Sequence, residues 1–204
     1  MYTPASFAET NQAKLHDLMR RNSFALLASQ SPGGLVASHL PLLLDAEAGP
    51  RGTLFGHMAR ANTQWREAQG PVMAVFSGPH AYISPTWYAE TGMVPTWNYV
   101  AVHAYGILTP VEGRDDLLDI LRRSVDVYEA GRQPPWLFDE SGVNVDGLLK
   151  AIVGFRIELT RLEGKWKLGQ NHPEPRRRRT AEALRSQPDA DSIAIAALME
   201  EGPG

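Results

Sequence analysis

The sequence of 204 residues contains no cysteine, which excludes disulfides, thiol catalysis and thiolate ligands for a metal. It has no apolar run near the ~18–20 residues of a membrane-spanning helix. The start, M-Y-T-P-A-S-F, has neither the charged nor the apolar region of a signal peptide. An excess of positive charge is also missing, because 20 Lys and Arg stand against 23 Asp and Glu for a net charge of −3. We therefore expect a cytoplasmic protein with no membrane partner and no global field that attracts nucleic acid.

Several motifs that carry chemistry are missing as well. The chain has no G-x-G-x-x-G after a strand, no G-x-x-x-x-G-K-[ST], no H-E-x-x-H and no G-x-S-x-G. The histidines at 39, 57, 80 and 103 fall on different predicted elements, without helical spacing and without adjacent carboxylates. We therefore predict no dedicated metal site.

What the chain does contain is an ordinary globular composition, with 43% hydrophobic and 21% charged residues. Periodicity and turn signals predict about seven strands and five helices. Most strands follow each other through turns rather than helices, which favours a mainly β fold with flanking α-helices, its antiparallel sheet closed into a barrel. The predicted helices are 11–22, 59–69, 114–132, 143–152 and 174–199. Two of them have an apolar stripe, which is formed in 11–22 by Leu15, Leu18 and Met19, and in 114–132 by Leu117, Leu118, Leu121, Val125 and Tyr128. The predicted strands include 24–29, 35–45, 53–58, 71–77 and 155–162. The turn signal at 31–34 predicts a hairpin of the first two strands, and Glu163-Gly164 is a predicted turn after the last.

The most unusual stretch runs from Phe76 to Gly106 and is rich in aromatic residues, proline and glycine. Its prolines argue against a helix and cut it into short pieces, with a strand after Pro95. Such a stretch can line a wall for a flat ligand with polar edges. It can equally be a rigid aromatic corner of the core.

Two short motifs are candidates for a binding site. In S-H-L-P, Pro41 cannot donate to a sheet ladder, so this part of the predicted strand should be an edge or a bulge, with His39 either at a site or on the surface. In G-H-M-A-R-A-N-T-Q-W, a strand end meets a predicted helix start. There Arg60 and the first N–H groups could hold a phosphate, or Asn62 or Thr63 could simply cap the helix.

The densest positive charge is the run from Arg176 to Arg179. It is either a solvated helix face or a contact for a phosphate backbone, and the sequence leaves both open.

Six segments carry a resemblance, and in chain order they are M-Y-T-P-x-x-F, S-H-L-P-L-L-L-D, G-H-M-A-R-A-N-x-Q-W, F-S-G-P-H-A-Y-I-S-P-x-W-Y, V-P-T-W-N-Y-V-A-V-H-A-Y-G and G-F-R-I-E-L-x-R-L-E-G-K-W-K-L-x-Q-N. Together they resemble one known family, the PaiB family of FMN-binding, transcriptional-regulator-like proteins. The resemblance covers roughly residues 1 to 172, and after Q-N the chain departs from the family pattern with H-P-E-P-R-R-R-R.

The resemblance implies an antiparallel Greek-key split β-barrel that binds FMN and forms a homodimer. The split-barrel domain would cover 1–172, and 173–204 would be a helical tail packed on the same domain. The implied function is a flavin-dependent redox protein or a flavin-linked negative transcriptional regulator. The alternatives are a haem-binding or haem-degrading protein and a DNA-associated regulator without catalysis.

The resemblance also implies the cofactor-binding residues, while a catalytic residue stays unknown. The S-H-L-P strand would face the flavin ring, the H-M-A-R-A-N junction would hold the phosphate through Arg60, and a third group would come from the partner subunit. The residues of these three groups are Ser38, His39, Leu40 and Pro41; His57, Met58, Ala59, Arg60 and Asn62; and Trp97, Asn98, Lys167 and Gln170.

Overall fold

The structure is a computed structural model that describes residues 1–139 and 144–201. Its strands form one mainly antiparallel sheet in the order β3-β2-β6-β7-β8-β5-β4, and β1 pairs with β8 outside this path. Helices flank the sheet, so the predicted fold class is confirmed. The hydrogen-bonded path is open, with β3 and β4 at its two ends. The expected closure into a complete barrel is therefore wrong.

The chain divides into two compact units, which we describe separately. The first unit contains residues 1–18, 77–103 and 163–204, and the second contains residues 19–76 and 104–162. Three long strands have residues in both units: β6 (Gln69–Ile83), β7 (Thr96–Val111) and β8 (Ile152–Lys167). The predicted boundary at residue 172 stays a prediction. None of the described helices is long and apolar enough to cross a membrane.

The second unit contains the predicted hairpin of β2 (Phe24–Ser31) and β3 (Gly34–Pro41). Its register runs without a shift from Ser31 opposite Gly34 to Phe24 opposite Pro41. Pro41 ends a strand at the edge of the sheet, as expected for a residue without an N–H donor. The chain then leaves the ladder, and the Leu42 amide donates to the Ser23 carbonyl (2.8 Å). The predicted single strand 35–45 is therefore two strands, the second being β4 (Leu43–Asp45).

The helices of the second unit are α2 (Gln64–Glu67), α3 (Arg114–Glu129) and α4 (Val145–Lys150). Of the predicted apolar stripe of α3, Leu117 and Leu118 are buried, whereas Tyr128 is 42% exposed. Helices α3 and α4 share one apolar cluster formed by Leu117, Leu118, Val145 and Leu149. The helix predicted here was 143–152, and its first residue, Val143, lies outside the described residues. The predicted helix 59–69 is wrong in extent, because β5 (Thr53–Ala59) runs on to Ala59 and α2 has only four residues.

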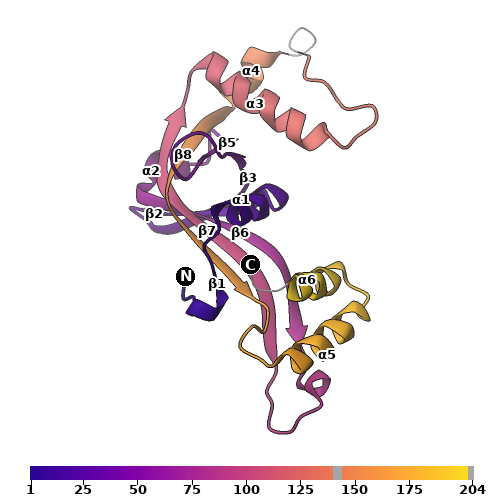
Figure 1. The fold of residues 1–204 in the computed structure, drawn as a ribbon. Coiled ribbons are helices and arrows are strands. Elements are labelled where there is room, and N and C mark those ends of the chain that lie inside the picture. The colour runs from indigo at the N-terminus through magenta and orange to yellow at the C-terminus, as the bar shows by residue number, and fades with distance from the viewer. Residues whose placement is uncertain (140–143, 202–204) are drawn as a thin grey trace. The chain divides into compact units, whose positions relative to one another are not determined.

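The first unit contains η1 (Ala5–Phe7), β1 (Ala8–Glu9), η2 (Pro85–Tyr88), α5 (Glu174–Arg185) and α6 (Ala190–Glu200). In Figure 1, α5 and α6 lie side by side, and between them they bury Ala181, Leu184, Ile195 and Ala196. The single predicted helix 174–199 is thus a helical pair. Helix α1 (Gln12–Arg21) has the predicted stripe, with Leu15, Leu18 and Met19 buried.

Two predicted interruptions of the sheet are wrong. Strand β6 continues through Pro79 to Ile83, because the backbone angle of proline is compatible with an extended chain. Strand β8 continues through the predicted turn at Gly164. A Cβ at Gly164 would lie 2.2 Å from the Leu15 side chain and 2.7 Å from the Glu9 carbonyl. This glycine therefore serves the close approach of β1 and α1 rather than a change of chain direction.

Candidate functional site

The first contact that joins two of the sequence motifs lies in the second unit. The Asn62 side-chain amide donates a hydrogen bond to the Ser38 hydroxyl (2.9 Å). Ser38 belongs to β3, and Asn62 lies in the turn between β5 and α2. The Asn62 side-chain oxygen also accepts from the Gln64 amide (3.0 Å), so its orientation is held from both ends. The S-H-L-P and H-M-A-R-A-N motifs therefore meet in space.

This meeting depends on a close approach of β5 to the end of β3. A Cβ at Gly56 would lie 2.9 Å from the Leu42 side chain and 3.2 Å from the Pro41 carbonyl, so only glycine leaves the space. Gln64 adds a second link, because its buried side-chain nitrogen donates to the Leu27 carbonyl (3.0 Å) and the Ser29 hydroxyl (3.1 Å). Its side-chain oxygen Oε1 is buried without a hydrogen-bond partner. Such an orphaned acceptor is uncommon in a folded protein.

Arg60 lies immediately after β5, and its own unit holds it tightly. Its guanidinium Nε donates to the Lys150 carbonyl (2.9 Å) and its Nη2 donates to the Ile152 carbonyl (2.8 Å). Its backbone amide donates to the Ala151 carbonyl (2.8 Å). The third nitrogen, Nη1, lies 3.5 Å from Glu112, and 42% of the side chain is exposed.

This geometry changes the expected phosphate cradle. Helix α2 begins at Gln64 and is one turn long, so Arg60 and Asn62 precede it rather than forming its first turn. The predicted support from a helix N-terminus is therefore wrong. An anchored guanidinium with one nitrogen turned away from the carbonyls still suits an oxyanion, because little conformational freedom remains to be lost on binding. The role of Arg60 in holding a phosphate stays a prediction.

The remaining predicted residues of this unit occupy both faces of their strands. Met58 is buried in the core, and the alternation of the strand puts His57 and Ala59 on the other face. Burial lowers the pKa of His57 below its ordinary value, so its imidazole is neutral at pH 7. His39 is exposed and stacks on Phe24 with ring centroids 6.0 Å apart, while Leu40 and Pro41 are half-buried.

The other four predicted residues lie in the first unit. Lys167 Nζ donates to the Trp97 carbonyl (2.6 Å) and to the Thr96 hydroxyl, and burial followed by the charge of Lys165 lowers its pKa. Asn98 is buried against Met199. Gln170 donates to the Trp166 carbonyl (2.6 Å). These three side chains hold local structure, whereas the Trp97 ring is exposed, and a cofactor role for all four stays a prediction.

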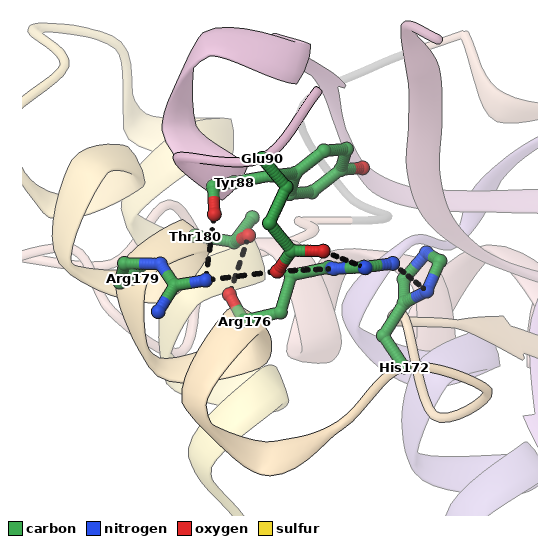
Figure 2. A network of polar contacts seen from close by, with 6 residues as sticks. All are labelled: Tyr88, Glu90, His172, Arg176, Arg179 and Thr180. Carbon is green, nitrogen blue, oxygen red and sulfur yellow. Dashed lines mark hydrogen bonds and ion pairs between the residues drawn. The ribbon is translucent and has the colours of Figure 1, made fainter. Parts of the chain in front are cut away.

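A polar network that sequence reasoning missed lies around Glu90, as Figure 2 shows. The Glu90 carboxylate pairs with Arg176 and with Arg179 Nη2 (3.0 Å), and Arg179 also donates to the Tyr88 carbonyl (2.6 Å). Arg177 donates to the Met199 carbonyl (2.9 Å). Arg176, Arg177 and Arg179 are thus engaged across the first unit, while Arg178 has a long contact to Glu182 on the same helix (3.9 Å). The spacing of the run held part of this signal, because Arg176 and Arg179 are three positions apart and therefore lie on one face of α5.

Comparisons with known proteins agree with this fold and these motifs. The family model described as "Putative FMN-binding domain" matches residues 1–161. The protease synthase and sporulation protein PAI 2 of Bacillus subtilis is 37% identical over 204 residues, which cover 98% of this chain and 97% of that protein. An uncharacterised protein of Aspergillus fumigatus is 31% identical over 83% of this chain and 85% of its own length.

Two solved structures share the fold at low sequence identity. The flavocytochrome Anf3 of Azotobacter vinelandii matches with a TM-score of 0.62 and 11% identity, over 78% of this chain and 69% of that chain. The FAD and heme binding protein of Mycobacterium smegmatis matches with a TM-score of 0.58 and 15% identity, over 79% and 74%. The predicted flavin-binding split-barrel fold is therefore confirmed, and the family model supports FMN as the cofactor.

Proposed function

We propose, because this chain belongs to the PaiB family of FMN-binding domains, that it is an FMN-dependent redox protein acting on a small molecule. When bound, FMN supplies the electron or hydride transfer, while the protein orients the ring and tunes its surroundings. The observation that carries the proposal is the hydrogen bond between Ser38 and Asn62, because it joins the two motifs that the family resemblance assigns to the flavin.

The residues around this contact fit the chemistry of FMN. The Ser38 hydroxyl and the Asn62 amide offer hydrogen-bonding groups that suit the polar edge of a flavin ring. The buried Gln64 oxygen is an acceptor that still needs a donor. Arg60 supplies a positive charge for the phosphate, which would compete with the Glu112 carboxylate for its Nη1. We assign to the same site Ser38, His39, Leu40, Pro41, His57, Ala59, Arg60 and Asn62, whereas the side chain of Met58 points into the core.

The visible spectrum of the purified protein with added FMN tests this proposal directly. We expect the two absorption bands of a bound, oxidised flavin, which bleach when an electron donor is added. A single intense haem band from the protein as purified would instead support the haem alternative, which the flavocytochrome and the FAD and heme binding protein suggest. A protein that takes up neither group would contradict the proposal.

A homodimer completes the proposal, with Trp97, Asn98, Lys167 and Gln170 contributed by the partner subunit. Light scattering at micromolar concentration tests it, and a monomer would contradict it. FMN titration of mixed dimers, formed from wild-type chains and chains carrying Trp97→Ala, would then show whether Trp97 acts on the flavin site of its own subunit or of the partner.

A second candidate is a DNA-associated regulator, which the sporulation name of the Bacillus subtilis relative suggests. The densest basic run gives this candidate little support, because Arg176, Arg177 and Arg179 are bound within the chain. Salt-sensitive, nanomolar binding to a specific DNA fragment would reverse the order of the two candidates.

A further inference from the structure

A second concave surface lies within the first unit. It is a groove of about 550 Å³, a volume typical of small-molecule sites. One wall is aromatic and consists of His80, Tyr82, Trp87 and Trp97. The other wall comes from the segment that joins α5 to α6 and from the first turn of α6, and it includes Asp189 and Asp191.

The aromatic wall is organised around Trp97. Tyr82 meets the Trp97 ring edge-on, with centroids 5.9 Å apart and planes at 72°, and the His80 ring lies 6.1 Å away on a tilted plane. Trp97 nevertheless remains 53% exposed and Tyr82 47% exposed. These rings therefore pack on one another and still leave aromatic surface exposed in the lining of the groove.

The opposite wall carries negative charge. Asp189 caps α6 by accepting from the Ser192 amide (2.7 Å), and this hydrogen bond lowers the pKa of the Asp189 carboxyl. Asp191 Oδ2 lies 3.2 Å from His80 Nδ1 and accepts from the His80 amide (3.4 Å). The described residues that line the groove include no Lys or Arg. Apart from His80 and Tyr82, the ionisable side chains of the lining are thus carboxylates.

Further contacts hold the walls in place. Trp87 belongs to η2, whose end is tied to α5 through Tyr88 and Glu90 (Figure 2). Lys167 Nζ donates to the Trp97 carbonyl, and the contact between His80 and Asp191 joins the two walls. A groove that is held in shape without a ligand loses little entropy when a ligand binds.

We propose that this groove binds a small organic ammonium ion. Aromatic faces attract a cation through their quadrupole, and a tetra-alkylammonium head also has apolar surface to bury against them. The Asp189 and Asp191 carboxylates add negative charge, which attracts the cation and disfavours an anion. All lining residues of this groove belong to the first unit, whereas Ser38, Asn62 and Arg60 belong to the second, and Trp97 is the one lining residue that the proposed dimer also assigns to a flavin site.

Choline is the probe, and its uncharged carbon analogue, in which carbon replaces the quaternary nitrogen, is the matched control ligand. We expect choline to shift the indole N–H resonance of Trp97 with a dissociation constant on the order of 1 mM. We expect the neutral analogue to bind at least about fivefold more weakly, because only the charged head gains the cation–π and carboxylate contacts. Equal binding of the two ligands, or no binding of choline, overturns the proposal.

Two substitutions test the two walls. Trp97→Ala and Asp191→Asn should each weaken choline binding by about three- to tenfold, read from the remaining indole resonances. Trp136→Phe is the matched control, because Trp136 is 54% exposed but lies in the second unit. If Trp97→Ala does not fold, Asp191→Asn alone decides. Unchanged choline affinity in a folded Asp191→Asn variant contradicts the carboxylate half of the proposal.

Titration of each variant with FMN separates this proposal from the flavin proposal. Loss of choline binding with normal FMN binding in Asp191→Asn supports an independent site. A protein that binds choline but never binds FMN leaves the ammonium site standing while the flavin proposal fails.

Discussion

The Asn62 amide donates to the Ser38 hydroxyl at 2.9 Å, although 24 positions of sequence separate the two residues. Ser38 lies on the edge strand β3. Asn62 lies in a turn, where its backbone amide donates to the Ala59 carbonyl (2.9 Å). Both side chains are thereby oriented by backbone structure before any ligand arrives. A pair of this kind favours one arrangement of a polar ligand edge over others.

We predict that Asn62→Ala weakens FMN binding by about three- to tenfold, the effect of losing one neutral hydrogen bond of roughly 0.5–1.5 kcal/mol. Fluorescence titration with FMN measures the change. Ser124→Ala is the control, because it removes a hydroxyl from α3 that donates to the Ile120 carbonyl of the same helix (2.8 Å). Equal effects of the two substitutions would mean that Asn62 acts through general stability.

Arg60→Ala should weaken FMN binding by about ten- to a hundredfold, which corresponds to a charge-assisted contact of roughly 1.5–3 kcal/mol. Riboflavin lacks the phosphate, so its affinity should change little. Titrating both ligands into the variant and into the control Arg66→Ala separates charge from general effects.

Arg60 also has a structural role, because its guanidinium donates hydrogen bonds to the Lys150 and Ile152 carbonyls. If FMN and riboflavin lose affinity equally in Arg60→Ala, only this anchoring role remains. Glu112→Gln then adds a sharper test, because removing the carboxylate 3.5 Å from Nη1 should strengthen FMN binding if that nitrogen meets the phosphate.

Glu90→Gln should lower the stability of the protein at pH 7. The hydrogen bond from Arg176 is the main cause that lowers the pKa of Glu90. A carboxyl with a lowered folded pKa adds stability above its unfolded pKa, and this stability is lost as the pH falls through the folded pKa. The difference between wild type and variant in urea midpoint should therefore shrink below the ordinary pKa of a glutamate.

Glu182→Gln is the control for that experiment. Glu182 also pairs with an arginine of α5, but the contact to Arg178 is long (3.9 Å) and exposed, and such pairs contribute little. A pH-independent difference for Glu90→Gln would mean that the network in Figure 2 does not stabilise the charged carboxylate.

Gly164→Ala should destabilise the fold by about 1–3 kcal/mol, because the added methyl group would overlap Leu15 and the Glu9 carbonyl. Gly131→Ala is the matched control, since nothing lies within 4 Å of a Cβ built there. Urea unfolding of both variants measures the difference. Equal stabilities would show that β1 and α1 move aside without cost.

Local patterns were enough to predict the elements whose pattern agrees with their surroundings. The stripe of Leu15, Leu18 and Met19 predicted α1, and Pro32 and Gly33 between two apolar runs predicted the β2–β3 hairpin. The motifs of the chain were also enough to predict the PaiB family, the split-barrel fold and FMN, because these depend on residue identity in order along the chain.

Tertiary contacts decided the rest. Gly164 is read as a turn from sequence, yet its missing side chain serves the approach of β1. The segment 59–69 has helical composition, but the Arg60 and Asn62 backbone amides donate to the Ala151 and Ala59 carbonyls. Within this segment the helix is therefore limited to Gln64–Glu67. The Arg176–Arg179 run suggests a basic surface, but its partners Glu90 and Met199 are far away in sequence. The sequence alone determined which chemical groups the chain contains. Only the folded chain decided which of these groups meet, because each contact joins two segments that are distant in sequence, and a local pattern carries no information about its distant partner.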